Sequence, residues 1–321
     1  MGIQAKYHNH AVRKVVGVYL GWRGLSATWE PFEELSFWER KDAAHRVGGY
    51  GAMTRLLTEL ENIQKDSLDV LPPHAPPTEL IIIGHSFGGA AVYSALSQII
   101  TERFVNSVAL SPPKQKRLKP LGDQIILLNP AFEAVRHYDL NLMARAIKDY
   151  PSDQRPVLSI FTSRGDWATH YVFPIGRFFS TLFDSNRNSK QKRADLDAVG
   201  WFKDFGTHEL SYDPKASYAT SDPSAPSPTT QEEDLPEPVQ LEQSVSSVEK
   251  ARGKWKPGQT YHFGKFALTP VNDFTPGDPF LVVSVDQQIM KDHSDIANPL
   301  LIKFIRDYIQ FCQADPEDRL K

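Results

Sequence analysis

A short stretch around residue 86 places the tightest constraint on how this chain can fold. Residues 80–83 are apolar and mostly β-branched, the pattern of a strand buried on both faces. Residues 90–100 hold good helix formers with apolar side chains at helical spacing. Between them lie Gly84-His85-Ser86-Phe87-Gly88, followed by Gly89. A strand that turns at once into a helix needs small residues beside the turn. It also leaves the residue at its tip, Ser86, exposed beside a helix N-terminus.

This strand, G-x-S-x-G turn and helix resemble the nucleophile elbow of the α/β-hydrolase family. The alternative for the same residues is a glycine-rich turn that carries a solvated serine. The resemblance covers residues 13–311 apart from an insertion at 213–250 and the lid around it. It implies a three-layer α/β/α sandwich with a mostly parallel sheet. The sheet is expected to be a reduced one, because the first two strands of the family are not evident in the sequence.

Alternating strand and helix patterns along the chain predict the same fold class, because parallel strands need crossover helices. Besides the strand at 80–83, buried strands are expected at residues 13–20, 124–129, 157–162 and 280–285. Helices are expected at 51–65, 90–100, 131–150 and 296–311. Residues 104–110 read as a short strand or an approach to one, and 261–271 as a short strand or hairpin.

The domain organisation that we expect is a core formed by residues 1–170 and 260–321, with a cap or lid at 171–259. Within the cap, residues 172–183 show an apolar face at helical spacing, suited to covering a pocket or to joining the core. Residues 213–250 are rich in Pro, Ser, Thr and Glu. Such a composition cannot bury enough apolar surface to offset the entropy of ordering, so it predicts a disordered insertion.

The resemblance also implies a catalytic triad in the chain order serine, acid, histidine. Ser86 lies at the elbow, Asp166 follows the strand at 157–162, and His293 follows the strand at 280–285. Glu133, after the strand at 124–129, is the alternative acid. We favour Asp166 because Gly165 beside it permits a tight turn.

Three other histidines are weaker candidates for the base. His208 has no predicted strand before it, and His170 follows Asp166 too closely to approach from a separate loop. His85 adjoins the elbow serine, where a strained turn directs neighbouring side chains away.

In the family, an oxyanion hole uses the main-chain N–H of the residue after the nucleophile and one N–H from an earlier loop. These correspond to Phe87 and to Gly21 or Trp22. The alternative for Gly21 and Trp22 is an ordinary strand-to-loop turn.

Composition narrows the function classes further. A formal net charge of −3 argues against general nucleic-acid binding. The single cysteine, Cys312, cannot form an intramolecular disulfide and is expected to be a small buried side chain. No signal peptide, membrane span, metal-ligand spacing or nucleotide fingerprint is recognised, so we expect a cytoplasmic protein without metal or cofactor.

The sequence therefore predicts a serine hydrolase that cleaves small-molecule or lipid carboxylic esters through an acyl-enzyme, with interfacial lipid contact left open. Aromatic residues near the expected pocket favour an apolar acyl group: Trp22, Phe87, Trp167 and Phe178. Phospholipase, thioesterase and amidase activities stay open because fold and triad do not fix the substrate. Arg23 and Arg164 suit either a substrate anion or surface ion pairs. The alternative from another class is an inactive α/β-hydrolase scaffold that serves as a binding module.

Overall fold

The structure is a computed structural model, and it describes eight segments of the 321-residue chain. These are residues 15–21, 51–70, 78–109, 117–151, 154–174, 189–216, 258–271 and 274–312. All structural statements below refer to these segments.

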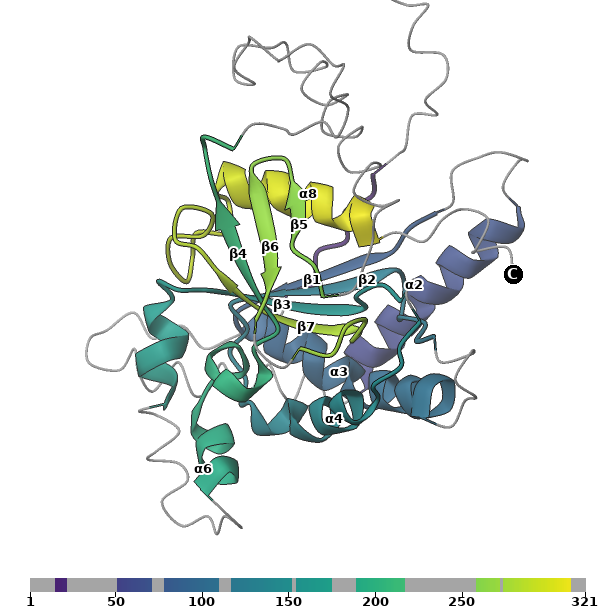
Figure 1. Ribbon diagram of the computed structural model, residues 1–321. Helices are drawn as coiled ribbons and strands as arrows, with labels where there is room; N and C mark the ends of the chain where they lie inside the picture. The colour runs from purple at the N-terminus through teal and green to yellow at the C-terminus, as the bar shows by residue number, and fades with distance from the viewer. Residues whose placement is uncertain are drawn as a thin grey trace, which may run out of the picture.

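A seven-stranded mixed sheet forms the centre of the molecule, in the order β1-β2-β3-β7-β4-β6-β5 (Figure 1). The strands are β1 (Ile81–His85), β2 (Gln124–Leu128), β3 (Leu158–Ser163), β4 (His208–Tyr212), β5 (Tyr261–Phe263), β6 (Phe266–Pro270) and β7 (Phe280–Val285). The pairs β1–β2, β2–β3, β3–β7 and β7–β4 are parallel, while β6 runs antiparallel to both β4 and β5. The carboxyl ends of β1, β2, β3 and β7 therefore meet at one edge of the sheet.

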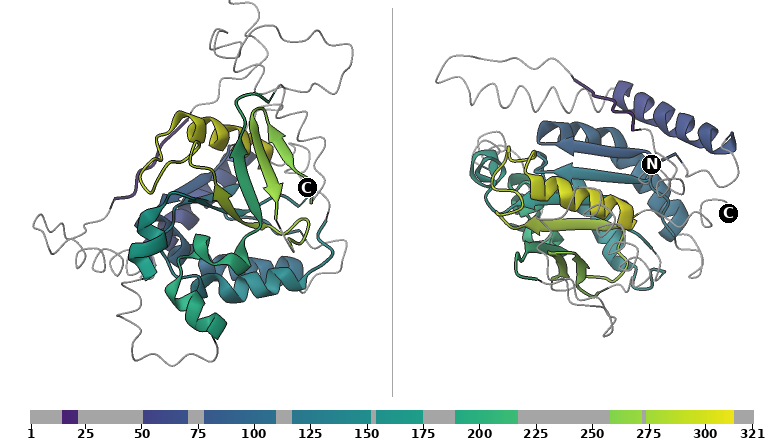
Figure 2. Two further views of the ribbon diagram at one scale, coloured as in Figure 1. Left: turned by 60° about the vertical axis from the view of Figure 1, so that its left-hand side comes forward. Right: turned by 90° about the horizontal axis from the view of Figure 1, so that it is seen from above.

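Helices cover both faces of this sheet, so the protein belongs to the α/β class with a mostly parallel sheet. The helices α2 (Ala52–Asp69), α3 (Phe87–Phe104) and α4 (Val135–Ala146) lie on one side, and α8 (Pro299–Cys312) lies on the other (Figure 1). The right-hand view of Figure 2, seen from above, shows α8 lying over the strands. Shorter elements connect them: α6 (Ser189–Leu196), η1 (Val105–Ala109), η3 (Ala168–Val172), η4 (Val199–Trp201) and η5 (Lys203–Phe205).

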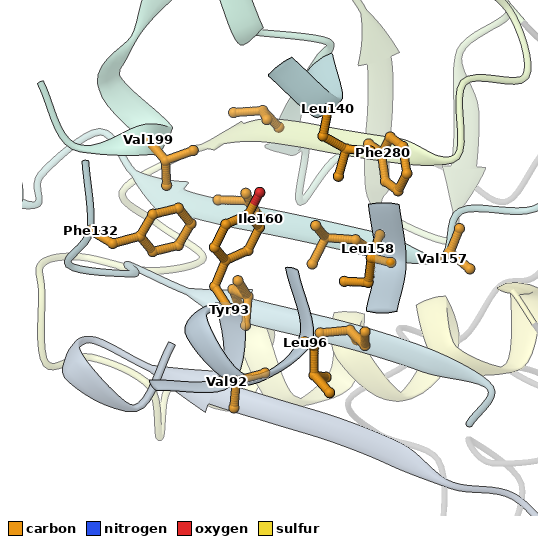
Figure 3. Packing of buried hydrophobic residues seen from close by; sticks show 14 of the residues in the cluster. Val92, Tyr93, Leu96, Phe132, Leu140, Val157, Leu158, Ile160, Val199 and Phe280 are labelled. Carbon is orange, nitrogen blue, oxygen red and sulfur yellow. The ribbon is translucent and has the colours of Figure 1, made fainter. Parts of the chain in front are cut away.

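The central strands are apolar on both faces because each face packs against helices. In β2, Ile125 and Leu127 join the cluster beneath α3 and α4, while Ile126 and Leu128 join the cluster beneath α8. Figure 3 shows the first cluster, in which Tyr93 of α3 lies beside Ile160 of β3 and Leu140 of α4 lies beside Phe280 of β7. This double burial explains why the predicted strands at 124–129, 157–162 and 280–285 are continuous apolar runs without alternation.

The prediction of a core strand at 13–20 is wrong for the part that the structure describes. Residues 15–20 form no strand, and Val15, Val16 and Val18 are 90%, 72% and 57% exposed. β-Branched residues favour a strand only where a neighbouring strand and a packed face are available. The described sheet ends at β1, and residues 15–20 pair with none of its strands.

The expected burial of the elbow strand on both faces is also only half right. Ile82 packs into the cluster beneath α3, but Ile83, which points to the opposite face, is 51% exposed. Within the described segments α8 packs over the centre of the sheet and leaves this part of β1 open.

The chain between β3 and β7 differs most from expectation. β4 lies inside the range 171–259 that was assigned to a cap, yet it is a strand of the central sheet between β7 and β6. Its burial alternates, with His208 and Leu210 buried and Glu209 exposed, so it lacks the apolar run that marks the other core strands. The predicted hairpin at 261–271 is confirmed as β5 and β6, whereas residues 105–109 continue α3 as the π-helix η1 and form no strand.

Several predictions fall outside the described residues. These are the cap helix beyond residue 174 with Phe178, the insertion beyond residue 216, and Trp22 and Arg23. The burial of Cys312 is confirmed, since this residue is only 6% exposed at the end of α8.

The core contains a histidine that should make stability depend on pH. His137 on α4 is fully buried, and burial lowers its pKa from 6.5 to about 4. Its Nδ1 lies 3.0 Å from the hydroxyl of Tyr93, and its ring packs edge-on against Phe205 and Phe280. The unfolded chain therefore binds a proton at this site between pH 6.5 and pH 4 while the folded chain does not.

We predict that the stabilisation linked to His137 is present above about pH 6.5 and is lost progressively as the pH falls to about 4, at about 1.4 kcal/mol per pH unit. The His137→Phe variant should gain stability relative to the native protein over this window, in urea unfolding measured from pH 7 to pH 4. His262→Phe, at an exposed position of β5, is the matched control. A constant difference between the His137→Phe variant and the native protein at every pH would contradict this account.

Candidate active site

Ser86 lies at the tip of a strained turn between β1 and α3. Its backbone has φ 53° and ψ −122°, in the left-handed half of the map that side chains rarely adopt. The turn closes tightly, since a Cβ on Gly84 would stand 2.8 Å from the Cα of Gly89. Glycine at both positions is therefore required by a close approach of backbone to backbone, as the sequence predicts.

The three residues predicted to form a triad meet at the carboxyl edge of the sheet. His293 Nε2 lies 2.8 Å from Ser86 Oγ. On its other side, His293 Nδ1 lies 3.0 Å from both carboxylate oxygens of Asp166. Because a carboxylate only accepts hydrogen bonds, Nδ1 carries the proton and Nε2 is left to accept from the serine hydroxyl.

The side chains of the three residues differ in their exposure to solvent. The Asp166 side chain is fully buried, whereas 22% of the His293 side chain is exposed. The loop that carries His293, between β7 and α8, lies beside the helical segment after β3 at the left of Figure 1. Serine and histidine are thus accessible while the acid is shielded.

The pair Thr169 and Trp201, which sequence reasoning missed, supports the acid. The main-chain N–H and the hydroxyl of Thr169 both donate to Asp166, at 3.0 and 2.5 Å. Trp201 Nε1 in turn donates to Thr169 Oγ1 at 3.0 Å. The spacing Asp-x-x-Thr before a helical segment is a recognisable N-cap pattern and could have revealed Thr169. No local signal marks Trp201, which approaches from η4.

The tight turn expected at Gly165 is present, since the N–H of Asp166 donates to the main-chain oxygen of Ser163 at 3.1 Å, and Gly165 has a further role in a contact between loops. A Cβ at this position would overlap the main-chain oxygen of Lys291 and stand 2.9 Å from Nε2 of Gln287. The loop with Asp166 and the loop with His293 are therefore in backbone contact at Gly165. This contact brings the acid and the base to hydrogen-bond distance.

The other candidate residues lie elsewhere. Glu133 pairs with Arg136 at 2.9 Å, so its carboxylate is engaged away from His293. His170 stacks on Trp201 with ring centroids 3.8 Å apart. His208 begins β4 and packs against Phe274, and burial lowers its pKa to about 4. His208 pairs with Val283 of β7, and β2, β3 and β7 separate β4 from β1, so His208 lies across the sheet from Ser86.

The predicted oxyanion donors are described in part. Phe87 is the first residue of α3, where the helix dipole is positive. Gly21 ends the described segment 15–21, and Trp22 lies outside it, so the second donor stays a prediction. Arg164 is engaged in an ion pair with Glu209 at 2.8 Å, as in the surface ion-pair alternative.

Within the described segments, no cluster of three or more His, Cys, Asp or Glu side chains could hold a metal ion. Across the same segments, none of the helices has the length and apolar character that crossing a bilayer requires. Comparison of the chain with protein-family models, with curated proteins and with solved structures finds no significant match. The site must therefore be interpreted from its own geometry.

We predict that Gly165→Ala separates the two loops and lowers any activity of the site by about tenfold or more, because small misplacements of reacting groups are costly. Gly206→Ala is the matched control, since a Cβ there meets its nearest atom at an ordinary 3.4 Å. Both variants should fold, as judged by circular dichroism. Equal activity of the two variants would show that the contact at Gly165 does not set the geometry.

Proposed function

We propose that this protein is a serine hydrolase that cleaves carboxylic esters through an acyl-enzyme intermediate. The observation that carries the proposal is the continuous hydrogen-bonded series from Asp166 through His293 to Ser86. A serine hydroxyl is a weak nucleophile unless a base takes its proton and a third group orients that base. All three functions have a residue in position at this edge of the sheet.

In the proposed mechanism, Ser86 Oγ attacks the ester carbonyl as its proton passes to His293 Nε2. The resulting imidazolium is stabilised by the buried Asp166 carboxylate. Charge on the former carbonyl oxygen is stabilised at the start of α3, where the main-chain N–H of Phe87 is the first donor. His293 then returns the proton to the leaving alcohol. Water, activated by the same histidine, hydrolyses the acyl-enzyme and releases Ser86.

Aromatic side chains support an apolar acyl group as the preferred substrate part. Trp167 and Tyr171, which follow Asp166, are 65% and 55% exposed. Large apolar side chains that stay exposed beside a reactive site are suited to contact a ligand. The engagement of Arg164 by Glu209 removes one argument for an anionic substrate.

We expect the native protein to hydrolyse p-nitrophenyl esters of short to medium acyl chains. Ser86→Ala should lower kcat by up to about a millionfold, because the elements of a triad act as one unit. Ser284→Ala, on β7, is the matched control with the same loss of one hydroxyl. Native-like turnover by folded Ser86→Ala protein would rule out the mechanism, and absence of turnover by the native protein on any ester would favour the binding-scaffold alternative.

Asp166→Asn is predicted to lower kcat by about ten-thousandfold, since the amide no longer enforces the histidine tautomer that accepts from serine. Asp286→Asn, at the end of β7, is the control for loss of one negative charge nearby. The kinetics of both variants should be measured on the same ester. If Asp166→Asn keeps full activity while Glu133→Gln loses it, the acid assignment is wrong.

A further inference from the structure

Strained backbone is concentrated beside this site. Of the non-glycine residues that the structure describes, only Ser86 and Asn129 have positive φ angles, 53° and 43°. Such conformations persist where surrounding contacts enforce them, and they gather at functional sites. Asn129 follows directly on β2, and it is completely buried.

The turn around Asn129 holds the backbone of Ser86 from both sides. The N–H of Ser86 donates to the main-chain oxygen of Leu128 at 3.0 Å. The main-chain oxygen of Ser86 accepts from the N–H of Ala131 at 3.1 Å. In addition, a Cβ on Gly89 would stand 2.8 Å from Pro130, so the first turn of α3 packs directly on this segment. The segment Leu128–Ala131 thus fixes the conformation of the serine.

The side chain of Asn129 continues the hydrogen bonding between β2 and β3 at the point where the Asn129 backbone turns away from the sheet. The N–H of Asn129 still donates to Phe161 of β3 at 2.8 Å, as in a parallel ladder. The next donor along β3, the N–H of Ser163, bonds to Asn129 Oδ1 at 2.8 Å. The side-chain oxygen therefore serves as acceptor for β3 at the point where the positive φ turns the chain away.

The remaining atoms of the amide reach the loop that carries the histidine. Asn129 Nδ2 donates to the main-chain oxygens of His293 and Asp292, at 3.0 and 3.1 Å, and lies 3.5 Å from the sulfur of Met290. The oxygen of His293 also accepts from His85 Nε2 at 2.7 Å. The Asn129 side chain thus connects three segments: the end of β3 before Asp166, the turn after β2 that binds the backbone of Ser86, and the backbone of His293.

We propose that Asn129 is a positioning residue that sets the spacing between Ser86 and His293. The proposal rests on the proposed function, because it assigns the residue a role in that same reaction. Asn129 contacts neither reacting side chain; it acts through the backbone of both. Loss of its N–H donors should let the His293 loop move and lengthen the Nε2 to Oγ contact, while the fold and the binding of substrate are retained.

Two variants separate this role from general stability. Asn129→Gly tolerates the positive φ and deletes the amide. Asn129→Asp keeps an acceptor for Ser163 but places an oxygen against the main-chain oxygens of His293 and Asp292. Asn106→Asp, at an exposed position of η1, is the matched control, since it makes the same change in an amide that donates to Glu102 and lies outside the loop that carries His293.

We expect both Asn129 variants to lose about 10- to 100-fold in kcat with KM nearly unchanged, and to react with a fluorophosphonate more slowly by a similar factor. The deficit of Asn129→Asp should shrink towards acid pH, because the protonated carboxyl group can again donate to His293. In NMR spectra, the Nδ1–H resonance of His293 should shift or broaden in both variants and stay unchanged in Asn106→Asp.

The outcomes are distinguishable. If the fluorophosphonate fails to label the native protein, the proposed function itself is wrong. If it labels native protein and both folded Asn129 variants at equal rates, only the positioning role is overturned. Loss of the folded state in both variants would also overturn it, because Asn129 would then be required for the fold and not for the spacing of the site.

Discussion

The whole site depends on hydrogen bonds between the backbone of the turn after β1 and the backbone at the end of β2. Ser86 directly follows β1 and Asn129 directly follows β2, and the parallel pairing of His85 with Leu128 brings these two strand ends side by side. The turn after β2 satisfies both main-chain polar groups of Ser86. The strained conformation of the serine is therefore supported by hydrogen bonds from a neighbouring strand end and does not depend on the elbow alone.

Backbone contacts also bring Asp166 and His293 together at the carboxyl ends of the parallel strands. Gly165 allows the loop after β3 to touch the loop after β7, and Asn129 donates to the backbone of that second loop. Thr169 donates two hydrogen bonds to Asp166, and these fix the orientation of the carboxylate independently of its contact with His293. Such a preorganised arrangement lowers the cost of positioning the reacting groups, which suits the ester hydrolysis that we propose.

Sequence patterns predicted the parts of this structure that depend on local chemistry. The glycines at 84 and 89 and the apolar runs of β2, β3 and β7 mark the elbow and the central strands. Residues 15–20 were wrongly predicted to form a strand, because β-branched side chains form strands only where a partner strand is available. The strand β4 was not predicted, because its short alternating pattern lacks an apolar run. Asn129 read only as the end of a strand, since its role depends on three segments that are distant in the sequence.

The most direct test of the account is to locate the residue that a fluorophosphonate modifies. Native protein treated with the probe should gain the mass of one adduct, and tandem mass spectrometry of its peptides should place that adduct on Ser86. The His293→Ala variant, which lacks the base, should react far more slowly under the same conditions. A protein that stays unmodified, or one modified at a different serine at a rate independent of His293, would contradict the assignment of Ser86, His293 and Asp166 as a catalytic unit.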